Sequence, residues 1–375
     1  MRKSRVNMDS MDFLLIASIM LLVAIGVVMV YSASSYTSSF SKLCNYDDMF
    51  YFKKQMMWAS IGFVFLFIMV KIDYHILPKF TLLIMIVTVA LLVIVFLFPP
   101  INGAKRWIPL GFASIQPSEI AKYVVILYMA KSIENKGDKI KTFFYGVFPY
   151  LMVSGFFAGM ILAEKNLSIA AVIMIVTLII LLVGGIKWTH MVELFGVVAG
   201  LGVTFILIEP YRLERLMNFT NPWADRKGAG YQLVQSLLAL GSGGISGVGL
   251  GASRQKMYYI PEPHTDFILA IIGEELGFIG CTIIILLFII FIWRGITTAL
   301  GAKDTFGTLL AIGITSVIAV QAVINIAVVS GAMPVTGVPL PFISYGGSSL
   351  FFNLGAMGIL LNISRQKGGN RRKTI

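Results

Sequence analysis

Apolar runs of about 20 residues, the length of helix that crosses a bilayer, recur along the whole chain and restrict its fold more than any other feature. Lipid offers the backbone no hydrogen-bond partner, so runs that are buried in a membrane must satisfy their own amide and carbonyl groups. Long and continuous runs do this as α-helices. The chain is 57% hydrophobic and only 13% charged, which leaves no room for a soluble domain.

The runs predict an all-α polytopic membrane protein, a bundle of ten transmembrane helices in a single domain over residues 1–375. The predicted spans are residues 12–31, 55–70, 80–98, 117–131, 143–162, 167–186, 189–208, 266–292, 305–330 and 345–363. A large structured outer loop, residues 209–265, joins the seventh and eighth spans. The first span is expected to be retained, because no small-residue cleavage site follows its long apolar stretch.

The distribution of basic residues predicts the orientation. With both termini in the cytoplasm, the cytoplasmic segments hold more than half of the 30 Lys and Arg residues, many of them in the tail at 364–375. Long loops are exported largely regardless of charge, so the basic outer loop is compatible with this orientation. The net charge of +12 is therefore divided between a tail that faces anionic lipid and the outer loop, and no nucleic-acid partner is expected.

The outer loop contains a glycine-rich segment, "GSGGISGVGLG" at 241–251. No strand precedes these glycines and no helix follows them, so they do not form a dinucleotide-binding motif. Leucines recur at helical spacing in the preceding stretch, "YQLVQSLLAL" at 231–240. This pattern predicts a short helix that either lies at the membrane surface or packs on the bundle.

The stretch "PEPHTDFILAIIGEELG", residues 261–277, places three carboxylates at the start of the eighth span. Asp266 stands at the water boundary, whereas Glu274 and Glu275 lie deeper. Guanidinium groups bind phosphate and a carboxylate can accept a proton, so cations beside Asp266 suit a phosphate-bearing substrate at the membrane surface. The candidate cations are Arg215, Arg226, Arg254 and Lys256, with Lys105 and Arg106 from another outer loop as weaker candidates. The alternative is that these are scattered loop charges.

Four buried charges are predicted to be structural: Lys122, Glu119, Glu274 and Glu275. Helical rise puts Lys122 and Glu274 at a similar depth, ~10 Å below the outer surface. A lone charge in the bilayer is unfavourable, so these two are expected to pair, with Glu275 or Glu119 as alternative partners for the lysine. The two cysteines, Cys44 and Cys281, have no metal-ligand spacing and are also expected to be structural.

Three blocks closely resemble the SEDS family, the shape, elongation, division and sporulation proteins. They are "NGAKRWI…IQPSEIAK" (102–122), the long block "NPWADRKGAGYQ…EELGFIG" (221–280) and "PVTGVPLPFISYGGSSL" (334–350). Within the second block, "SRQKMYYIPEPHTDF" resembles the division and sporulation branch (FtsW and SpoVE) more than the elongation branch (RodA). The likeness covers essentially all ten spans.

The resemblance implies a peptidoglycan glycosyltransferase that polymerises lipid II at the outer face of the bacterial cytoplasmic membrane. It further implies a class B penicillin-binding protein, a transpeptidase, as partner, with other division or sporulation proteins as further candidates. By position, the family's essential acid falls on Asp266 and its outer-loop tryptophan on Trp107. Trp107 is expected either to face a sugar or to anchor its loop, and His264 either to tune Asp266 or to cap the turn.

The chemistry fits these residues. The 4-hydroxyl of an acceptor sugar must attack the anomeric carbon of a donor, and Asp266 at a helix N-terminus is suited to take the proton. The cations would stabilise the departing pyrophosphate. A divalent cation, Mg or Mn, is compatible with this reaction, but no metal-ligand cluster in the sequence requires it.

One motif departs from the family. After the fifth span the family shows an acidic residue, proline and aspartate, whereas this chain has Glu164, Lys165 and Asn166, so the role of that aspartate does not transfer. Two other functions remain open: a lipid II flippase, which would also place polar residues within its spans, and a scaffold that recruits a transpeptidase. A flippase needs a polar pathway across the whole membrane, and the buried charges are predicted only in the outer halves of the spans.

Overall fold

The structure, a computed structural model, describes residues 11–100, 103–111, 114–208, 219–228 and 230–366. An α-helix lies over each predicted span, which confirms the all-α fold. The long helices are α1 (Phe13–Ser39), α2 (Phe50–Lys71), α3 (Leu77–Ile94), α4 (Pro117–Lys136), α5 (Phe148–Ala163), α6 (Leu167–Val183), α7 (Trp188–Ile208), α10 (Ile268–Leu300), α11 (Thr305–Val329) and α12 (Gly347–Arg365).

Seven of these helices are long and apolar enough to cross a membrane, namely α1, α2, α3, α5, α10, α11 and α12, some with short flanking turns. A further apolar helix, α6, has 17 residues and is shorter than the usual span. The chain is thus a membrane protein by its helices, and the count of ten crossings stays a prediction.

Short elements join the long helices. A two-residue antiparallel ribbon, β1 (Ile108–Pro109) and β2 (Ser114–Ile115), follows α3. The single turns are η1 (Lys42–Cys44), η2 (Tyr74–Ile76), η3 (Val95–Leu97), η4 (Gly137–Lys141) and η5 (Phe143–Val147). Helix α9 (Tyr231–Gly243) forms where leucine spacing predicted a helix, and it packs on α10 and α11. The Ser236 hydroxyl donates to the Val329 carbonyl at 2.8 Å, so of the two alternatives α9 adopts the packed one.

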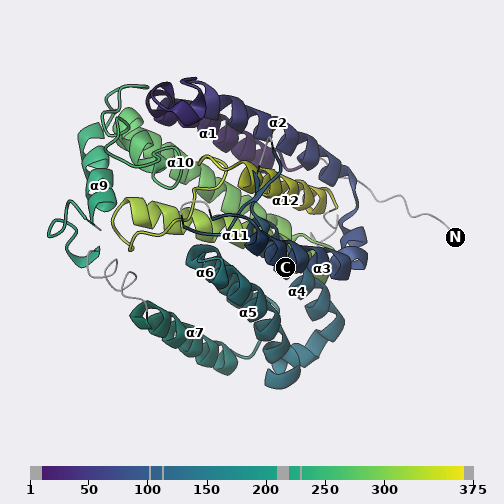
Figure 1. The fold of residues 1–375 in the computed structure, drawn as a ribbon. Coiled ribbons are helices and arrows are strands. Elements are labelled where there is room, and N and C mark those ends of the chain that lie inside the picture. The colour runs from purple at the N-terminus through teal and green to yellow at the C-terminus, as the bar shows by residue number, and fades with distance from the viewer. Residues whose placement is uncertain (1–10, 101–102, 112–113, 209–218, 229, 367–375) are drawn as a thin grey trace.

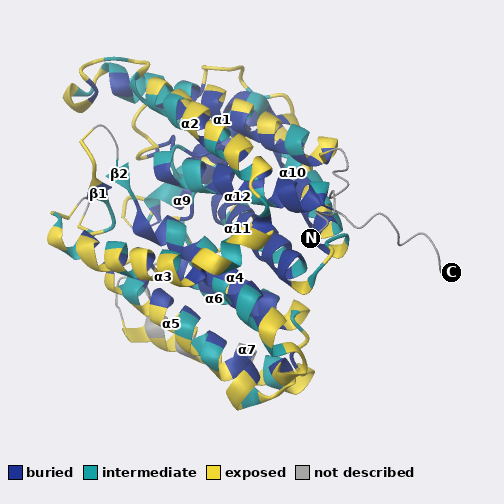
Figure 2. Cartoon of the chain, turned by 90° about the vertical axis from the view of Figure 1, so that its right-hand side faces the viewer, coloured by how far each residue is buried: buried dark blue, intermediate teal, exposed yellow. Residues whose placement is uncertain are grey.

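Helix α11 lies in the middle of the bundle, where it contacts α4, α6, α10 and α12 (Figure 1). Helices α1, α2, α10 and α12 form one side, with α12 packed along α2, and α7 lies at the edge beyond α5 and α6. We call the end where α10 begins the Asp266 end. Exposed positions recur along the outer helices (Figure 2). Many of them hold large apolar residues, such as Val64, Leu82 and Phe278, as expected of lipid-facing positions.

Helix α10 breaks at Gly277, whose backbone (φ 66°, ψ −163°) is outside the helical region. The break frees backbone groups on both sides of it, and the glycine-rich segment pairs with them. The Val248 amide donates to the Glu274 carbonyl at 3.0 Å, and the Phe278 amide donates to the Gly244 carbonyl at 2.9 Å. Gly243 and Gly247 allow this close packing, because a Cβ at these positions would lie 1.9 Å from the Gly273 carbonyl oxygen and 2.1 Å from the Glu275 carbonyl oxygen of α10.

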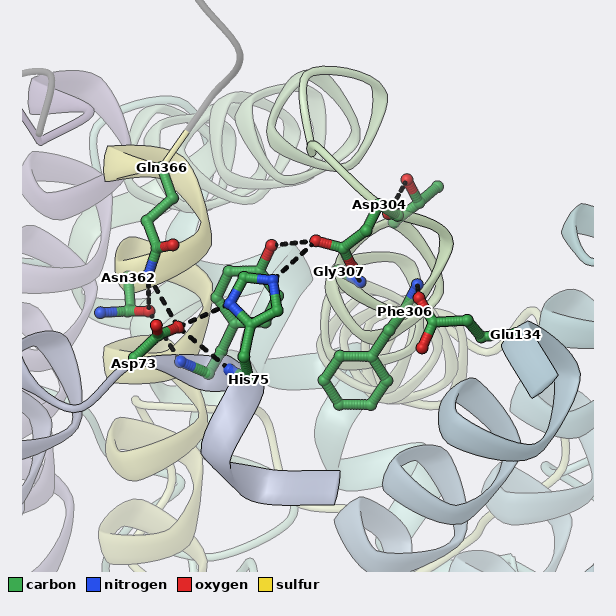
Figure 3. Close-up of polar contacts among 10 residues, drawn as sticks. Asp73, His75, Glu134, Asp304, Phe306, Gly307, Asn362 and Gln366 are labelled. Carbon is green, nitrogen blue, oxygen red and sulfur yellow. Dashed lines mark hydrogen bonds and ion pairs between the residues drawn. The ribbon is translucent and has the colours of Figure 1, made fainter. Parts of the chain in front are cut away.

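Polar side chains join neighbouring helices and turns at the opposite end of the bundle (Figure 3). His75, between α2 and α3, contacts Asp73 at 2.7 Å and Asp304, which precedes α11, at 3.0 Å. The Asn362 amide of α12 donates to the Val70 carbonyl of α2 at 2.7 Å. The turn between α2 and α3 is thus tied to the start of α11, and α2 is tied to α12, at this end.

Candidate functional site

The turn before α10 presents Asp266 at the end of the bundle, and its backbone is held from three directions. The side chain of Asp266 is half-buried. Three consecutive carbonyls each accept one hydrogen bond: His264 from the Tyr345 amide (2.8 Å), Thr265 from the Ser344 hydroxyl (2.8 Å) and Asp266 from the Asn325 side-chain amide (2.7 Å). We call these three bonds the carbonyl clasp.

The His264 ring is buried between two tyrosines. Its centroid lies 4.1 Å from that of Tyr51 at the start of α2 and 5.5 Å from that of Tyr345. Burial lowers the pKa of His264 to about 4, so the imidazole is neutral at neutral pH. The ring therefore packs the turn, and it offers no cation to a substrate phosphate.

The segment between α11 and α12 forms a wall beside the Asp266 carboxylate. Gly337 has no side chain, and a Cβ built on it would lie 3.3 Å from Asp266 Oδ2. Further along this segment Val338, Leu340 and Ile343 are buried. The carboxylate thus faces a rigid backbone at close range on this side.

Glu274 and Glu275 hold the turn that carries two of the predicted cations. Glu274 accepts hydrogen bonds from the Ser253 hydroxyl and from the Arg254 amide, the latter at 3.0 Å. Glu275 pairs with the Lys256 ammonium at 2.9 Å and accepts from a serine of α1. The Lys256 side chain is only 4% exposed, which argues against the prediction that it binds substrate phosphate. The Arg254 side chain is exposed and keeps that role as a proposal.

The other predicted cations differ in their surroundings. The Lys105 ammonium donates to the Phe96 carbonyl at 2.8 Å. The Arg106 guanidinium donates to the Glu164 carbonyl at 3.2 Å and also to that of the next residue, so it caps the end of α5. Trp107 is half-buried beside β1, and neither of its two expected roles is tested. Arg226 is exposed, and Arg215 lies outside the described residues.

The segment that departs from the family forms the turn between α5 and α6. The Glu164 carboxylate is buried, and neither oxygen has a hydrogen-bond partner. Burial raises the pKa of Glu164 from 4.5 to about 8, opposed by the nearby Arg106. Asn166 caps α6 by accepting from the Ile169 amide at 3.3 Å. Lys165 has φ 62°, a conformation that proline cannot adopt, so this turn is specific to the sequence found here.

The prediction that Lys122 pairs with Glu274 is wrong, and the alternative partner Glu119 is the one observed. The Lys122 ammonium lies 2.8 Å from Glu119 Oε2 and 3.2 Å from Gln321 Oε1 of α11. Glu119 is one turn before Lys122 on the same helix, whereas Glu274 faces the outer-loop turn. All four predicted buried charges are buried. Both cysteines are unpaired thiols.

No group of three His, Cys, Asp or Glu side chains gathers in a metal-binding arrangement within the described residues.

Comparison with known proteins places this arrangement in a family. Residues 12–369 match the model of the FtsW, RodA and SpoVE proteins, whose description is "Cell cycle protein". The chain belongs to this family. It is 44% identical over 362 residues to stage V sporulation protein E of Bacillus subtilis (strain 168), covering 95% of this chain and 97% of that protein. It is 41% identical over 368 residues to a probable peptidoglycan glycosyltransferase FtsW of Geobacter sp. (strain M18), covering 97% and 99%.

Solved members of the family share the fold. A chain from a peptidoglycan synthase complex, solved to show the coordination of polymerization and crosslinking, superposes with a TM-score of 0.80 at 25% identity, covering 96% of this chain and 99% of that one. The rod shape determining protein RodA of Thermus thermophilus superposes with a TM-score of 0.69 at 25% identity over the same shares of the two chains.

Proposed function

We propose that the chain is a peptidoglycan glycosyltransferase that polymerises lipid II. Its FtsW relatives carry that activity in their names, and the likeness to them covers nearly the full length of both chains. The observation that carries the proposal is the Asp266 turn, in which three hydrogen bonds to successive backbone carbonyls hold the residue that carries a half-buried carboxylate. The exposed Arg254 belongs to the outer-loop turn that Glu274 binds on the same helix. This arrangement supplies a proton acceptor and a cation at one end of a membrane bundle.

Asp266 acts as the general base in this proposal. The acceptor 4-hydroxyl loses its proton to the carboxylate as its oxygen forms a bond to the anomeric carbon of the donor. The bond from that carbon to the lipid pyrophosphate breaks, and its electron pair leaves with the phosphate oxygen. A positioned base contributes roughly 10²- to 10⁴-fold to such a step.

Arg254 and Arg226 are the cations that we assign to the pyrophosphate. Both side chains are exposed. The Arg254 amide donates to Glu274, so the Arg254 side chain extends from an outer-loop turn that is held against α10 about two turns from its start. Arginine binds phosphate through paired hydrogen bonds and stays charged at all relevant pH values.

The Asp266 end faces the outside of the bacterial cytoplasmic membrane in this proposal, and both termini lie in the cytoplasm. The positive-inside bias supports the orientation. The chain acts as one integral membrane domain with a class B penicillin-binding protein, as the likeness to a chain of a peptidoglycan synthase complex suggests.

A lipid II flippase is the rival function. Among the described residues, the buried ion pairs between side chains lie towards the two ends, with Lys122–Glu119 and Lys256–Glu275 towards the Asp266 end and Arg294–Asp12 at the opposite end. The opposite end is also tied by the polar contacts around His75. This distribution favours a reaction at one surface over transport through the bundle. A scaffold role would not account for the positioned carboxylate of Asp266.

Purified full-length chain, with and without its penicillin-binding partner, should convert lipid II into glycan polymer separable by gel electrophoresis. The matched control is the partner alone. Movement of lipid II across liposome membranes without any polymer would favour the flippase. If the chain shows neither activity in the presence of the correct partner, the scaffold role would be favoured.

A further inference from the structure

We propose that Asn325 and Ser344 are positioning residues that set the place of the Asp266 carboxylate for the reaction. This inference rests on the proposed function and adds residues to it. Asn325 lies within the predicted span 305–330, and Ser344 directly precedes the predicted span 345–363. Both become significant because of the backbone groups that they bind.

The backbone carbonyls of residues 264–266 accept their hydrogen bonds from other parts of the chain. Helix α10 begins at Ile268 with Phe267 as its N-cap, so the carbonyls of residues 264–266 lie before its hydrogen-bond ladder. A buried carbonyl without a partner is unfavourable, especially at membrane depth. The carbonyl clasp supplies one donor to each of the three, so the turn is held at three successive residues.

The donors of the clasp are themselves fixed. The Asn325 amide also donates to the Val338 carbonyl at 2.8 Å, and the Ser344 hydroxyl accepts from the Leu340 amide at 2.8 Å. Asn325 belongs to α11, the central helix, and is 1% exposed. Each donor therefore connects the Asp266 turn to the wall that follows α11.

The same wall touches the carboxylate. Gly337 precedes Val338, and its missing side chain leaves room for Asp266 Oδ2. The clasp thus fixes the backbone of Asp266 relative to the segment that borders its side chain. Because a misplacement of about 1 Å at a reacting group can lower a rate by ~10²-fold, loss of a clasp bond should act on the chemical step.

A purely structural role for Asn325 is the alternative, and the chain offers a matched control for it. Asn362 is 2% exposed, donates to the Val70 carbonyl at 2.7 Å and accepts from the Tyr74 amide at 3.1 Å. It has the same side chain, similar burial and two backbone partners, but it lies at the opposite end of the bundle. Its loss should reduce stability without moving Asp266.

The test measures kcat and KM for lipid II polymerisation by the full chain with its partner, per folded molecule, for Asn325→Ala, Ser344→Ala and Asn362→Ala. We expect the first two to lower kcat by about 10- to 100-fold with KM within about twofold. Asn362→Ala should lower the melting temperature but leave kcat within about twofold of wild type. Ser344→Thr keeps the hydroxyl and should recover most of the activity that Ser344→Ala loses.

Two results would overturn the proposal while the wild-type chain remains active. One is unchanged kcat in both Asn325→Ala and Ser344→Ala. The other is an equal loss of kcat in Asn362→Ala, which would make the effect one of general stability. If Asn325→Ala does not fold, the comparison of Ser344→Ala with Ser344→Thr decides alone. An inactive wild-type chain would instead refute the proposed function.

Discussion

Replacement of Lys122 by methionine should destabilise the fold strongly, because its ammonium neutralises a carboxylate that has no access to water. The side chains of Lys122 and Glu119 are 0% and 2% exposed, and their charged atoms lie 2.8 Å apart. Lys122→Met leaves the Glu119 carboxylate buried without a counter-charge. Breaking a buried pair in this way costs about 3–5 kcal/mol, and we expect a loss of that order in the free energy of unfolding.

The loss should be reversed by neutralising the correct partner. Glu119→Gln in the Lys122→Met background removes the unpaired charge, so it should recover most of the lost stability. Glu274→Gln in the same background should recover none, because Glu274 binds the outer-loop turn.

Unfolding of the purified chain in mixed micelles, followed by circular dichroism, gives these values. The control is Lys141→Met, whose pair with Asp138 is exposed, and its unfolding midpoint should not change. Rescue of Lys122→Met by Glu274→Gln and not by Glu119→Gln would refute the pairing and its energetic consequence.

Two further changes test the described geometry by the same unfolding assay. Glu164 has a raised pKa, so the folded state holds its proton more tightly, and its contribution to stability is full below pH 4.5 and falls as the pH rises towards about 8. Glu164→Gln should therefore stabilise the chain at pH 7 by up to roughly 3 kcal/mol and have little effect at pH 4, and an equal effect at both would contradict the buried acid. Gly277→Ala places a Cβ 2.5 Å from the Ile245 carbonyl oxygen at a positive φ and should cost at least about 2 kcal/mol. The control Gly159→Ala meets no atom within 4 Å and should be neutral or slightly stabilising, so equal effects of the two would argue against the break in α10.

The helices could be predicted from sequence because apolar length is a local signal, but some of their ends could not. Helix α1 continues to Ser39, beyond the predicted end at residue 31. Small polar side chains in this part are compatible with a helix because they bond to carbonyls one turn earlier, as Ser34 does to Val30. The break at Gly277 was also missed. It depends on backbone pairing with the glycine-rich segment, and that contact between distant parts of the chain has no local pattern.

The sequence predicted the position of Asp266 just before the eighth long helix, but it did not predict the surroundings of several candidate cations. Counting residues along each helix placed Lys122 and Glu274 at the same depth in the membrane. Depth does not show which way a side chain faces, and the partner that Lys122 contacts is Glu119, one turn away on the same helix. The sequence predicted that Lys256 binds phosphate, because nothing local shows that it pairs with Glu275. The two residues are 19 positions apart and meet only when the outer loop folds back onto α10. A buried asparagine in a span is a signal of function or hydrogen bonding, yet only the structure shows that Asn325 binds the Asp266 carbonyl.

The most direct test of the central claim is polymerisation of lipid II by Asp266→Asn in a purified system free of other glycosyltransferases. The substitution keeps the shape and hydrogen-bonding capacity of the side chain but removes the base. The variant should insert, bind its partner and bind lipid II, and it should make no glycan polymer, while Asp266→Glu retains at most a trace. Polymer formed by Asp266→Asn at a near wild-type rate would contradict the assignment of Asp266 as the general base.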